Sequence, residues 1–177
     1  MASICSGVLS FRRFTITAEM SGASSTLPAS ASISDAVNLA DAPSVGLTPQ
    51  QAVVEASLVQ AEAGTPADAP KIAAVIANRL KQGTALQIDA TLCYAKGGCP
   101  PVPTDADRKI DSPYNTYKTT GLPPTPIRTV SEVALKAALA PAPVPYRYYV
   151  SDANGKTYYA TTLQEHEKNV AKARNGG

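Results

Sequence analysis

A carboxyl group near the end of an apolar stretch is the first candidate for chemistry. Glu62 follows Leu58 and Val59 by four and three residues, so these apolar side chains lie beside it if the stretch is helical. Contact with these apolar side chains and the negative end of the helix dipole would both favour the protonated form of the Glu62 carboxyl group. A general acid needs this form near neutral pH. From position alone, an exposed glutamate at a helix end is an equally good interpretation.

Other carboxyl groups could act together with Glu62. A two-carboxylate glycosidase needs a pair that flanks one bond, and Asp89 and Asp111 are the candidates for the second group. Either aspartate could instead cap a turn. Glu55 lies two helical turns before Glu62, about 10 Å away, which is far for a catalytic pair. We therefore expect Glu55 to be a solvated surface charge.

Hydroxyl, amide and aromatic side chains gather on a proline-rich stretch over Pro100–Pro126. Ser112, Tyr114 and Asn115 lie there, and the segment Gly121–Ile127 follows them. Tyrosine rings can stack on sugar faces while hydroxyl and amide groups bond to sugar hydroxyls, so the composition favours a sugar-binding loop. A structural crossover rich in proline is the alternative.

Cysteine and histidine are scarce. One histidine and three cysteines are too few for a conventional zinc site, so no metal is expected. Cys93 and Cys99 bracket a short glycine-containing loop, and in an oxidising compartment a disulfide is favoured over metal binding or catalysis. His166 lies on the last predicted helix, where a lone histidine is usually a structural residue.

The overall composition excludes several classes of protein. The 177 residues include 16 Lys+Arg and 14 Asp+Glu, and the net charge of +2 is too small to indicate a nucleic-acid partner. Hydrophobic residues make up 44% of the chain, which suits one domain with a real core. No apolar run approaches the roughly 20 residues of a membrane helix.

Local signals predict the elements that would position these residues. Thr48, Pro49 and Gln51 form the start signal of a helix, with a capping box, and Gly64 ends it. The pattern predicts helices over Pro49–Ala63, Pro70–Gly83, Ser131–Leu139 and Leu163–Ala173, a strand or extended segment over Ala85–Leu92, and a hairpin of Tyr146–Val150 and Lys156–Ala160. Asn154 and Gly155 supply the hairpin turn. The fold class is α+β.

Met1–Gly46 differs from the rest of the chain. It is rich in Ser and Ala, carries few charges and shows no apolar period, and its two adjacent arginines follow a short apolar piece instead of preceding it. That order does not indicate a secretory signal. We expect a poorly ordered segment, or the remnant of a longer upstream region, followed by one domain over residues 47–177.

Five blocks in this order resemble the endolytic murein transglycosylase family, also called YceG-like. They are Ala56–Ala63, where the family reads roughly ASIVEKE, then Ile72–Leu80, Leu86–Thr91, Asp111–Tyr117 and Gly121–Ile127. The tyrosine-rich hairpin and the pair Glu165-His166 complete the pattern.

The resemblance implies a small lysozyme-like catalytic domain, the C-terminal domain of the family. It implies a lyase that cleaves peptidoglycan glycan strands internally between N-acetylmuramic acid and N-acetylglucosamine, leaves 1,6-anhydro ends and needs no cofactor. The catalytic glutamate of the family falls on Glu62. The cleft would be lined by Asn78, Gln87, Asp89, Ser112, Tyr114 and Asn115. Action on the outer side of the bacterial membrane and peptidoglycan synthases as partners are implied as well.

The chain departs from the family pattern at three places. Gln60 replaces the first glutamate of ASIVEKE, which favours Glu62 as the acid, and Thr157 replaces a histidine of the hairpin. The family has an upstream membrane anchor and a LysM-like domain, for which Met1–Gly46 is too short and too polar, so we expect a fragment, a mis-started reading frame or a truncated paralogue. A non-catalytic glycan-binding module and a two-carboxylate hydrolase are the alternative functions.

Overall fold

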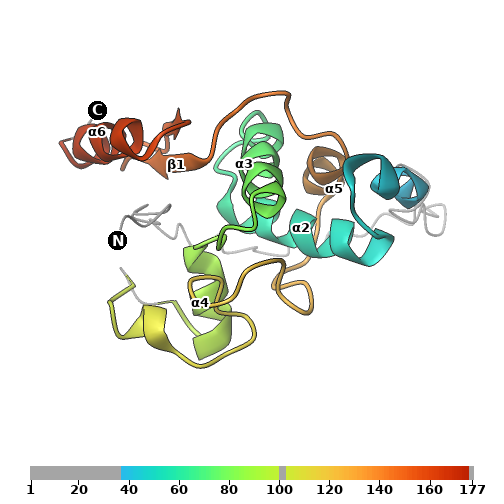
Figure 1. Ribbon diagram of the computed structural model, residues 1–177. Coiled ribbons are helices and arrows are strands. Elements are labelled where there is room, and N and C mark those ends of the chain that lie inside the picture. The colour runs from blue at the N-terminus through green and yellow to red at the C-terminus, as the bar shows by residue number, and fades with distance from the viewer. Residues whose placement is uncertain (1–36, 100–102, 176–177) are drawn as a thin grey trace, which may run out of the picture.

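The computed structural model describes residues 37–99 and 103–175 of the chain. Three helices form its centre: α2 (Pro49–Glu62), α3 (Ala69–Lys81) and α5 (Glu132–Leu139). The two-stranded sheet of β1 (Tyr148–Ser151) and β2 (Thr157–Ala160) lies with α6 (Leu163–Arg174) on one side of α2. Helix α4 (Asp89–Lys96) and the short 3₁₀ helix η2 (Asp107–Lys109) lie on the other side (Figure 1). The α+β class is confirmed.

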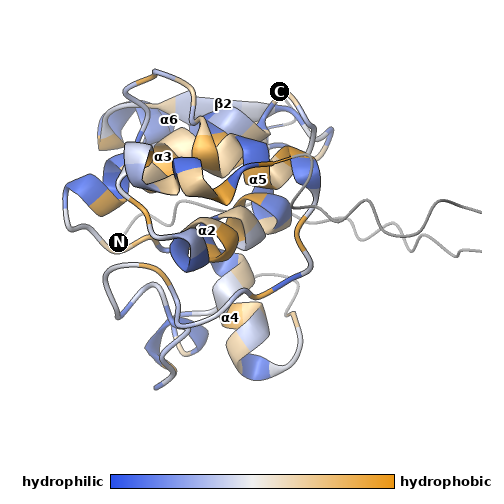
Figure 2. Ribbon diagram, turned by 90° about the vertical axis from the view of Figure 1, so that its right-hand side faces the viewer, coloured by the Kyte–Doolittle hydropathy of each residue, from blue (hydrophilic) through white to orange (hydrophobic). Residues whose placement is uncertain are grey.

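The start of α2 follows the predicted capping box. The Thr48 hydroxyl accepts a hydrogen bond from the Gln51 N–H at 3.2 Å, and the Gln51 side chain accepts one from the Thr48 N–H at 2.8 Å. α2 then buries its small and branched residues against α3 and α5, where apolar residues concentrate (Figure 2). Ala56, Leu58 and Val59 are fully buried there. Among the described residues, no helix is long and apolar enough to cross a membrane.

The hairpin forms where it was predicted. Tyr148 pairs with Ala160 and Ser151 with Thr157 in an antiparallel register. At the turn, the carboxylate of Asp152 accepts hydrogen bonds from the N–H groups of Asn154 and Lys156, both at 2.9 Å. Gly155 has a φ of 82°, a conformation that a β-carbon disfavours, and it completes the turn.

The prediction of a strand or extended segment over Ala85–Leu92 is confirmed up to Ile88 as an extended segment and is wrong from Asp89 on. Residues 84–88 are extended without forming a strand, but a helix begins at Asp89. The extended part is held by the proline-rich stretch: the Gln87 N–H donates to the Thr116 carbonyl at 2.9 Å, and the Ile88 N–H donates to the Thr116 hydroxyl at 3.0 Å. A sequence pattern of alternating apolar residues does not separate such a segment from a strand, because the pairing partner is distant in sequence.

Residues 37–46 also differ from expectation. They belong to the segment predicted to be poorly ordered, but the 3₁₀ helix η1 (Leu39–Val45) packs on α2 and α5. Ala42 is fully buried, and Val37 belongs to the hydrophobic core with 6% of its surface exposed. The prediction for residues 1–36 lies outside the described residues.

The packing of η1 leads to a prediction about stability. A chain that starts at residue 47 should unfold more easily than a chain that starts at residue 37, by about 2 kcal/mol or more, because it loses the burial of Val37 and Ala42. Urea unfolding of the two chains, followed by circular dichroism, measures the difference. Equal unfolding midpoints would show that η1 contributes nothing to the core.

Candidate active site

The carboxyl group of Glu62 lies where three elements meet. Glu62 is the last residue of α2, and its Oε1 accepts a hydrogen bond from the Ala90 N–H of α4 at 3.4 Å. Its Oε2 accepts one from the Tyr149 hydroxyl of β1 at 2.9 Å. These donors lie 28 and 87 residues further along the chain. The side chain is half-buried, so this fixed carboxyl group is still reachable from solvent.

The electrostatic surroundings of Glu62 differ in part from those predicted. The carboxyl group lies at the negative end of α2, as expected, but it also faces the first turn of α4, whose N–H groups have no partner within the helix. Ala90 supplies one of these N–H groups. Donors at a helix N-terminus stabilise a carboxylate and oppose the effect of the α2 dipole.

Asp89, the first residue of α4, brings a second carboxyl group close to Glu62. It is 8% exposed and accepts a hydrogen bond from the Tyr117 hydroxyl. Burial raises the pKa of Asp89 to about 6; the negative charge of Glu62 adds to the rise, while Tyr117 and Arg108 oppose it. The two carboxyl groups therefore influence each other electrostatically, and Asp89 is mostly ionised at neutral pH.

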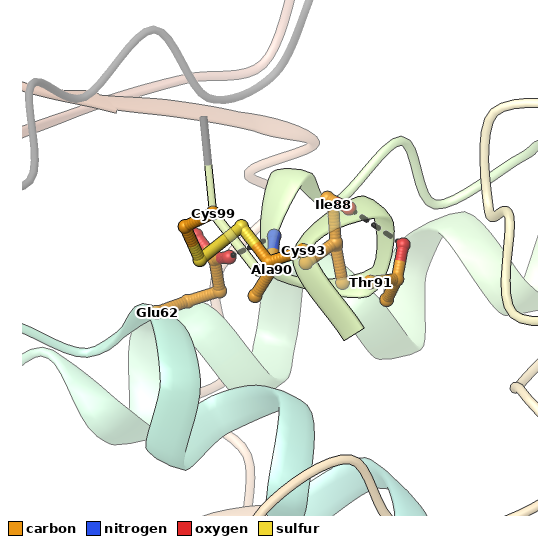
Figure 3. Close-up of a disulfide and its surroundings, with 6 residues drawn as sticks. All are labelled: Glu62, Ile88, Ala90, Thr91, Cys93 and Cys99. Atoms are coloured by element: carbon orange, nitrogen blue, oxygen red, sulfur yellow. Dashed lines mark hydrogen bonds between the residues drawn. A yellow bond between two sulfur atoms is a disulfide. The ribbon is translucent and has the colours of Figure 1, made fainter. Parts of the chain in front are cut away.

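A disulfide and an exposed tyrosine line a cavity near Glu62. The structure joins Cys93 and Cys99, which places the bridge next to Glu62 and Ala90 (Figure 3). The cavity, of about 240 Å³, lies next to Ala61, the residue before Glu62, and Ala90, whose N–H binds Glu62; Glu62 itself is not among its lining residues. Its lining is Ala61, Ala90, Cys93, Tyr94, Cys99, Ile127 and Arg128. The ring of Tyr94, 45% exposed, lies 4.7 Å from the ring of Tyr114, so the predicted sugar-binding tyrosine is part of this region.

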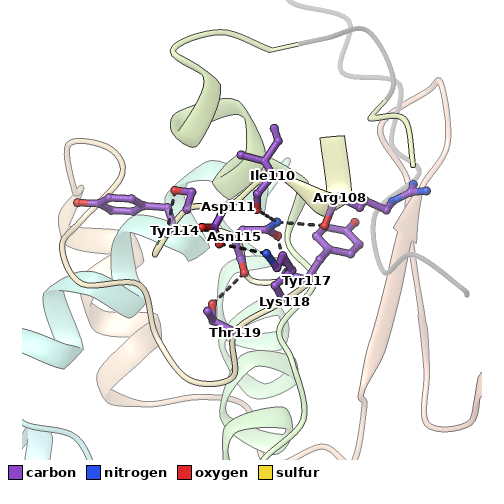
Figure 4. A network of polar contacts seen from close by, with 9 residues as sticks. Arg108, Ile110, Asp111, Tyr114, Asn115, Tyr117, Lys118 and Thr119 are labelled. Carbon is purple, nitrogen blue, oxygen red and sulfur yellow. Dashed lines mark hydrogen bonds and ion pairs between the residues drawn. The ribbon is translucent and has the colours of Figure 1, made fainter. Parts of the chain in front are cut away.

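Two predicted substrate-binding residues make hydrogen bonds inside the protein. The Asn115 amide is fully buried and donates to the carbonyls of Arg108 and Ile110 at 3.0 and 2.7 Å, while its oxygen accepts from the Tyr117 N–H at 3.0 Å (Figure 4). The Asn78 amide donates to the carbonyls of Val144 and Tyr146, both at 2.9 Å. These amides hold two loops in place, and their donors are already used.

Gln87 and Ser112 lie nearer to the surface but also support the backbone. Gln87 is the one described non-glycine residue with a positive φ, 56°, and its side chain accepts a hydrogen bond from Arg79 at 3.1 Å. The same guanidinium donates to the carbonyl of Ala85 at 2.7 Å, which fixes the approach to α4. The Ser112 hydroxyl accepts from the Tyr114 N–H at 3.2 Å.

The other candidates are separated from Glu62 by their surroundings. The side chain of Asp111 is fully exposed and pairs with Lys118 at 3.1 Å. His166 is fully buried and stacks on Tyr148 with 5.2 Å between ring centroids, in agreement with the structural role predicted for it. Within residues 37–99 and 103–175, no group of three His, Cys, Asp or Glu residues could hold a metal ion.

Sequence reasoning missed the two tyrosines that contact the carboxyl groups. Tyr149 and Tyr117 occur in segments noted for their tyrosines, but nothing in the spacing pairs them with Glu62 and Asp89, because both contacts are long-range. Gln60, which departs from the family pattern, uses its side-chain oxygen to accept from the Ser131 N–H at 3.2 Å, next to the start of α5.

Glu55 is the clearest correction. It was expected to be a solvated surface charge, but it is 1% exposed, and neither carboxyl oxygen has a hydrogen-bond partner in the described structure. Burial raises the pKa of Glu55 to about 8. The error arises because α2 is apolar on nearly all sides, so its periodicity does not mark an exposed face.

Comparison with known proteins assigns the chain to a family. The model of the YceG-like family matches residues 10–172. The chain belongs to the YceG-like family. Two curated relatives are endolytic murein transglycosylases: that of Bacillus subtilis is 45% identical over 64% of this chain, and that of Streptococcus pneumoniae is 36% identical over 73%. The matches span 31% and 24% of those relatives, so the chain corresponds to less than a third of their length.

A solved YceG-like structure has the same fold. The crystal structure of a yceG-like protein from Listeria monocytogenes superimposes with a TM-score of 0.69 at 36% identity, over 73% of this chain and 43% of that one. The resemblance seen in the sequence blocks is therefore confirmed at the level of family and fold.

The role of Asn115 in this YceG-like chain can be tested by stability. Asn115→Ala should lower the free energy of unfolding by about 2 kcal/mol, because the buried carbonyls of Arg108 and Ile110 lose their donor. Ser112→Ala, which removes one half-exposed hydroxyl, is the matched control and should cost less than about 1 kcal/mol. If Asn115→Ala loses no more stability than Ser112→Ala, Asn115 has no structural role.

The burial of Glu55 predicts a pH-dependent stability. With its pKa raised to about 8, Glu55 keeps its proton in the folded protein up to about pH 8, whereas the unfolded chain loses it near the ordinary glutamate pKa of 4.5. The unfolded state then binds fewer protons between these values, so the free energy of unfolding falls by up to about 1.4 kcal/mol per pH unit in that window. Glu55→Gln should remove this decrease in the free energy of unfolding, because the amide does not titrate.

Urea unfolding at pH 5 and pH 8 tests this prediction. The stability of Glu55→Gln relative to the wild type should rise between the two pH values, while the exposed control Glu167→Gln should follow the wild type. Parallel pH dependence of Glu55→Gln and the wild type would mean that Glu55 is not buried in solution.

Proposed function

We propose that this domain is the catalytic part of an endolytic murein transglycosylase. The enzyme would cleave peptidoglycan glycan strands internally, between N-acetylmuramic acid and N-acetylglucosamine, and leave 1,6-anhydro ends. The names of the curated relatives support this reaction. The observation that carries the proposal is the half-buried Glu62 carboxyl group, which is bound by donors from α4 and β1 and adjoins residues that line a cavity, Ala61 and Ala90.

Glu62 alone can perform both proton transfers of this reaction. It first donates its proton to the glycosidic oxygen while the bond from C1 to that oxygen breaks. Its carboxylate then accepts the proton of the C6 hydroxyl while that oxygen bonds to C1 of the muramic acid. Glu62 is protonated again at the end of the reaction, and neither water nor a cofactor is consumed.

The neighbours of Glu62 support both of its protonation states. The Ala90 N–H and the Tyr149 hydroxyl stabilise the carboxylate that exists between the two transfers. The ionised Asp89 acts in the other direction, because a nearby negative charge favours the protonated form of Glu62. A group that must both give and take a proton needs this kind of balance.

The cavity beside Glu62 suits a sugar. The exposed Tyr94 ring offers a face for stacking, and the ring of Tyr114, whose hydroxyl lies 2.7 Å from the Thr125 hydroxyl, packs 4.7 Å from it. Arg128 lines the cavity and can donate to sugar hydroxyl or carboxyl oxygens.

A two-carboxylate hydrolase has weaker support. Asp111 is fully exposed and paired with Lys118, and Asp89 is nearly buried against Tyr117, so neither offers a free carboxylate that could activate water. We place the reaction outside the cytoplasmic membrane, where peptidoglycan lies and where a disulfide is stable. Peptidoglycan synthases are proposed as partners by family analogy alone.

The central test is Glu62→Gln. The amide keeps the size of the side chain but cannot transfer a proton, so turnover of purified peptidoglycan should fall at least ~100-fold. Mass spectrometry of the products should show 1,6-anhydro ends with the wild type. Asp111→Asn, which changes an exposed carboxylate, is the matched control and should keep its activity.

Each alternative predicts a different product pattern. Reducing ends would indicate a hydrolase, and binding without products would indicate a glycan-binding module. Wild-type activity in Glu62→Gln would remove Glu62 from the mechanism.

A further inference from the structure

The cavity near Glu62 combines an apolar wall with one charged side chain. The apolar part of the lining is Ala61, Ala90, Ile127 and the disulfide of Cys93 and Cys99. Figure 3 shows this disulfide beside the Glu62 side chain. Arg128 is the one charged residue among the described residues of the lining. A ligand that fits this wall carries a small apolar group next to an anion.

The guanidinium group of Arg128 lies beside the end of α2. Its Nη1 donates a hydrogen bond to the Gln60 carbonyl at 3.4 Å, two residues before Glu62. The side chain is exposed, and none of the ion pairs between the described residues includes it. Because a guanidinium group has five N–H donors, this one long bond leaves it able to bind both oxygens of a carboxylate.

The muramic acid of the proposed substrate carries a group with both features. Its lactyl ether at C3 consists of a carbon that bears a methyl group and a carboxyl group, whereas N-acetylglucosamine has a hydroxyl group at C3. One ring carbon separates C3 from C1, the atom at which the bond breaks. The lactyl group therefore lies near the catalytic carboxyl group but not at it. The cavity has the same relation to Glu62, because it is lined by Ala61 and Ala90 and not by Glu62.

We propose that this cavity receives the lactyl group of the muramic acid, with the carboxylate on Arg128 and the methyl group against the apolar wall. The assignment rests on the proposed function, and it makes Arg128 the residue that selects peptidoglycan over a glycan of N-acetylglucosamine alone. Charge-assisted hydrogen bonds favour the carboxylate, and the methyl group buries apolar surface. The ring of Tyr94, 45% exposed, is left to stack on the sugar.

The negative charge of the site makes a cation necessary for an anionic ligand. Burial raises the pKa of Asp89 to about 6, so Asp89 is mostly ionised at neutral pH, and Glu62 becomes negative between its two proton transfers. Both charges repel a further carboxylate. Arg128 offsets this repulsion by direct contact. Without Arg128, the uncharged form of the same ligand should bind at least as well as the charged form.

A titration of the full chain with the disaccharide of N-acetylglucosamine linked to N-acetylmuramic acid tests the proposal. This disaccharide ends at C1 of the muramic acid, so it lacks the bond that the enzyme would cleave. At pH 7 and low salt, we expect a dissociation constant in the millimolar range, measured by NMR. The methyl ester of the lactyl group, which has no charge, and the dimer of N-acetylglucosamine should each bind about 10-fold more weakly.

Two variants locate the preference on the structure. Arg128→Ala should bind the disaccharide and its methyl ester with equal affinity, or the ester more tightly. Arg174→Ala changes an exposed arginine of α6 that does not line the cavity, so this matched control should keep the wild-type preference. The ratio of the two affinities is the readout, because a general loss of stability lowers both affinities alike.

Three results would overturn the proposal: no binding of the disaccharide up to tens of millimolar, equal affinity for acid and ester in the wild type, or an unchanged preference in Arg128→Ala. The first two concern the wild-type chain and do not depend on whether a variant folds. None of them measures turnover. A wild type that prefers the acid but forms no 1,6-anhydro ends would contradict the proposed reaction and not the lactyl site.

Stem peptides provide a second source of carboxylates and need their own comparison. A stem peptide is joined to the lactyl carboxyl group by an amide bond, which removes its charge. The wild type should therefore cleave strands freed of stem peptides with a KM about 10-fold lower than that for peptide-bearing strands, and Arg128→Ala should not distinguish them. A wild-type preference for peptide-bearing strands that Arg128→Ala loses would assign the carboxylate to the peptide and overturn the lactyl assignment.

Discussion

The arrangement of the candidate active site depends on two hydrogen bonds to one carboxyl group. The Ala90 N–H and the Tyr149 hydroxyl both donate to Glu62, and they arrive from segments 28 and 87 residues away. The end of α2, the start of α4 and strand β1 must therefore be placed together before the carboxyl group has its surroundings. Each of these elements is short, so its position comes from packing and from the loops that hold it.

Internal polar side chains do much of that placing. Asn78 binds the carbonyls that precede β1, Arg79 binds the carbonyl of Ala85 before α4, and Asn115 binds the loop that carries Tyr117. The hydroxyl of Ser57, buried in α2, accepts from the Ile127 N–H at 3.1 Å and fixes the proline-rich segment to the central helix. Proline lacks an N–H and breaks regular structure. The N–H and carbonyl groups of such loops therefore need side-chain partners.

The parts of the fold that could be predicted are those encoded by neighbouring residues. The capping box at Thr48, the Asn154-Gly155 turn and the period of α3 each act within a few residues, and the structure confirms them. The helix at Asp89 and the internal roles of Asn78 and Asn115 depend on partners far along the chain, so no local pattern identified them. The resemblance to a family indicated Glu62 as the candidate acid, but its contact with Tyr149 needed the packed structure.

Glu55 and Glu62 show how packing gives the same side chain two different chemistries. They lie on the same helix, seven residues apart, and the sequence alone assigned them by position. Glu62 is half-buried with an N–H donor and a hydroxyl donor, which stabilise its carboxylate. Glu55 is buried, and neither of its carboxyl oxygens has a hydrogen-bond partner in the described structure, so its charged form is unstable. The difference lies in what α4, β1 and η1 place against α2, which makes the neighbours of α2 as important to function as its own residues.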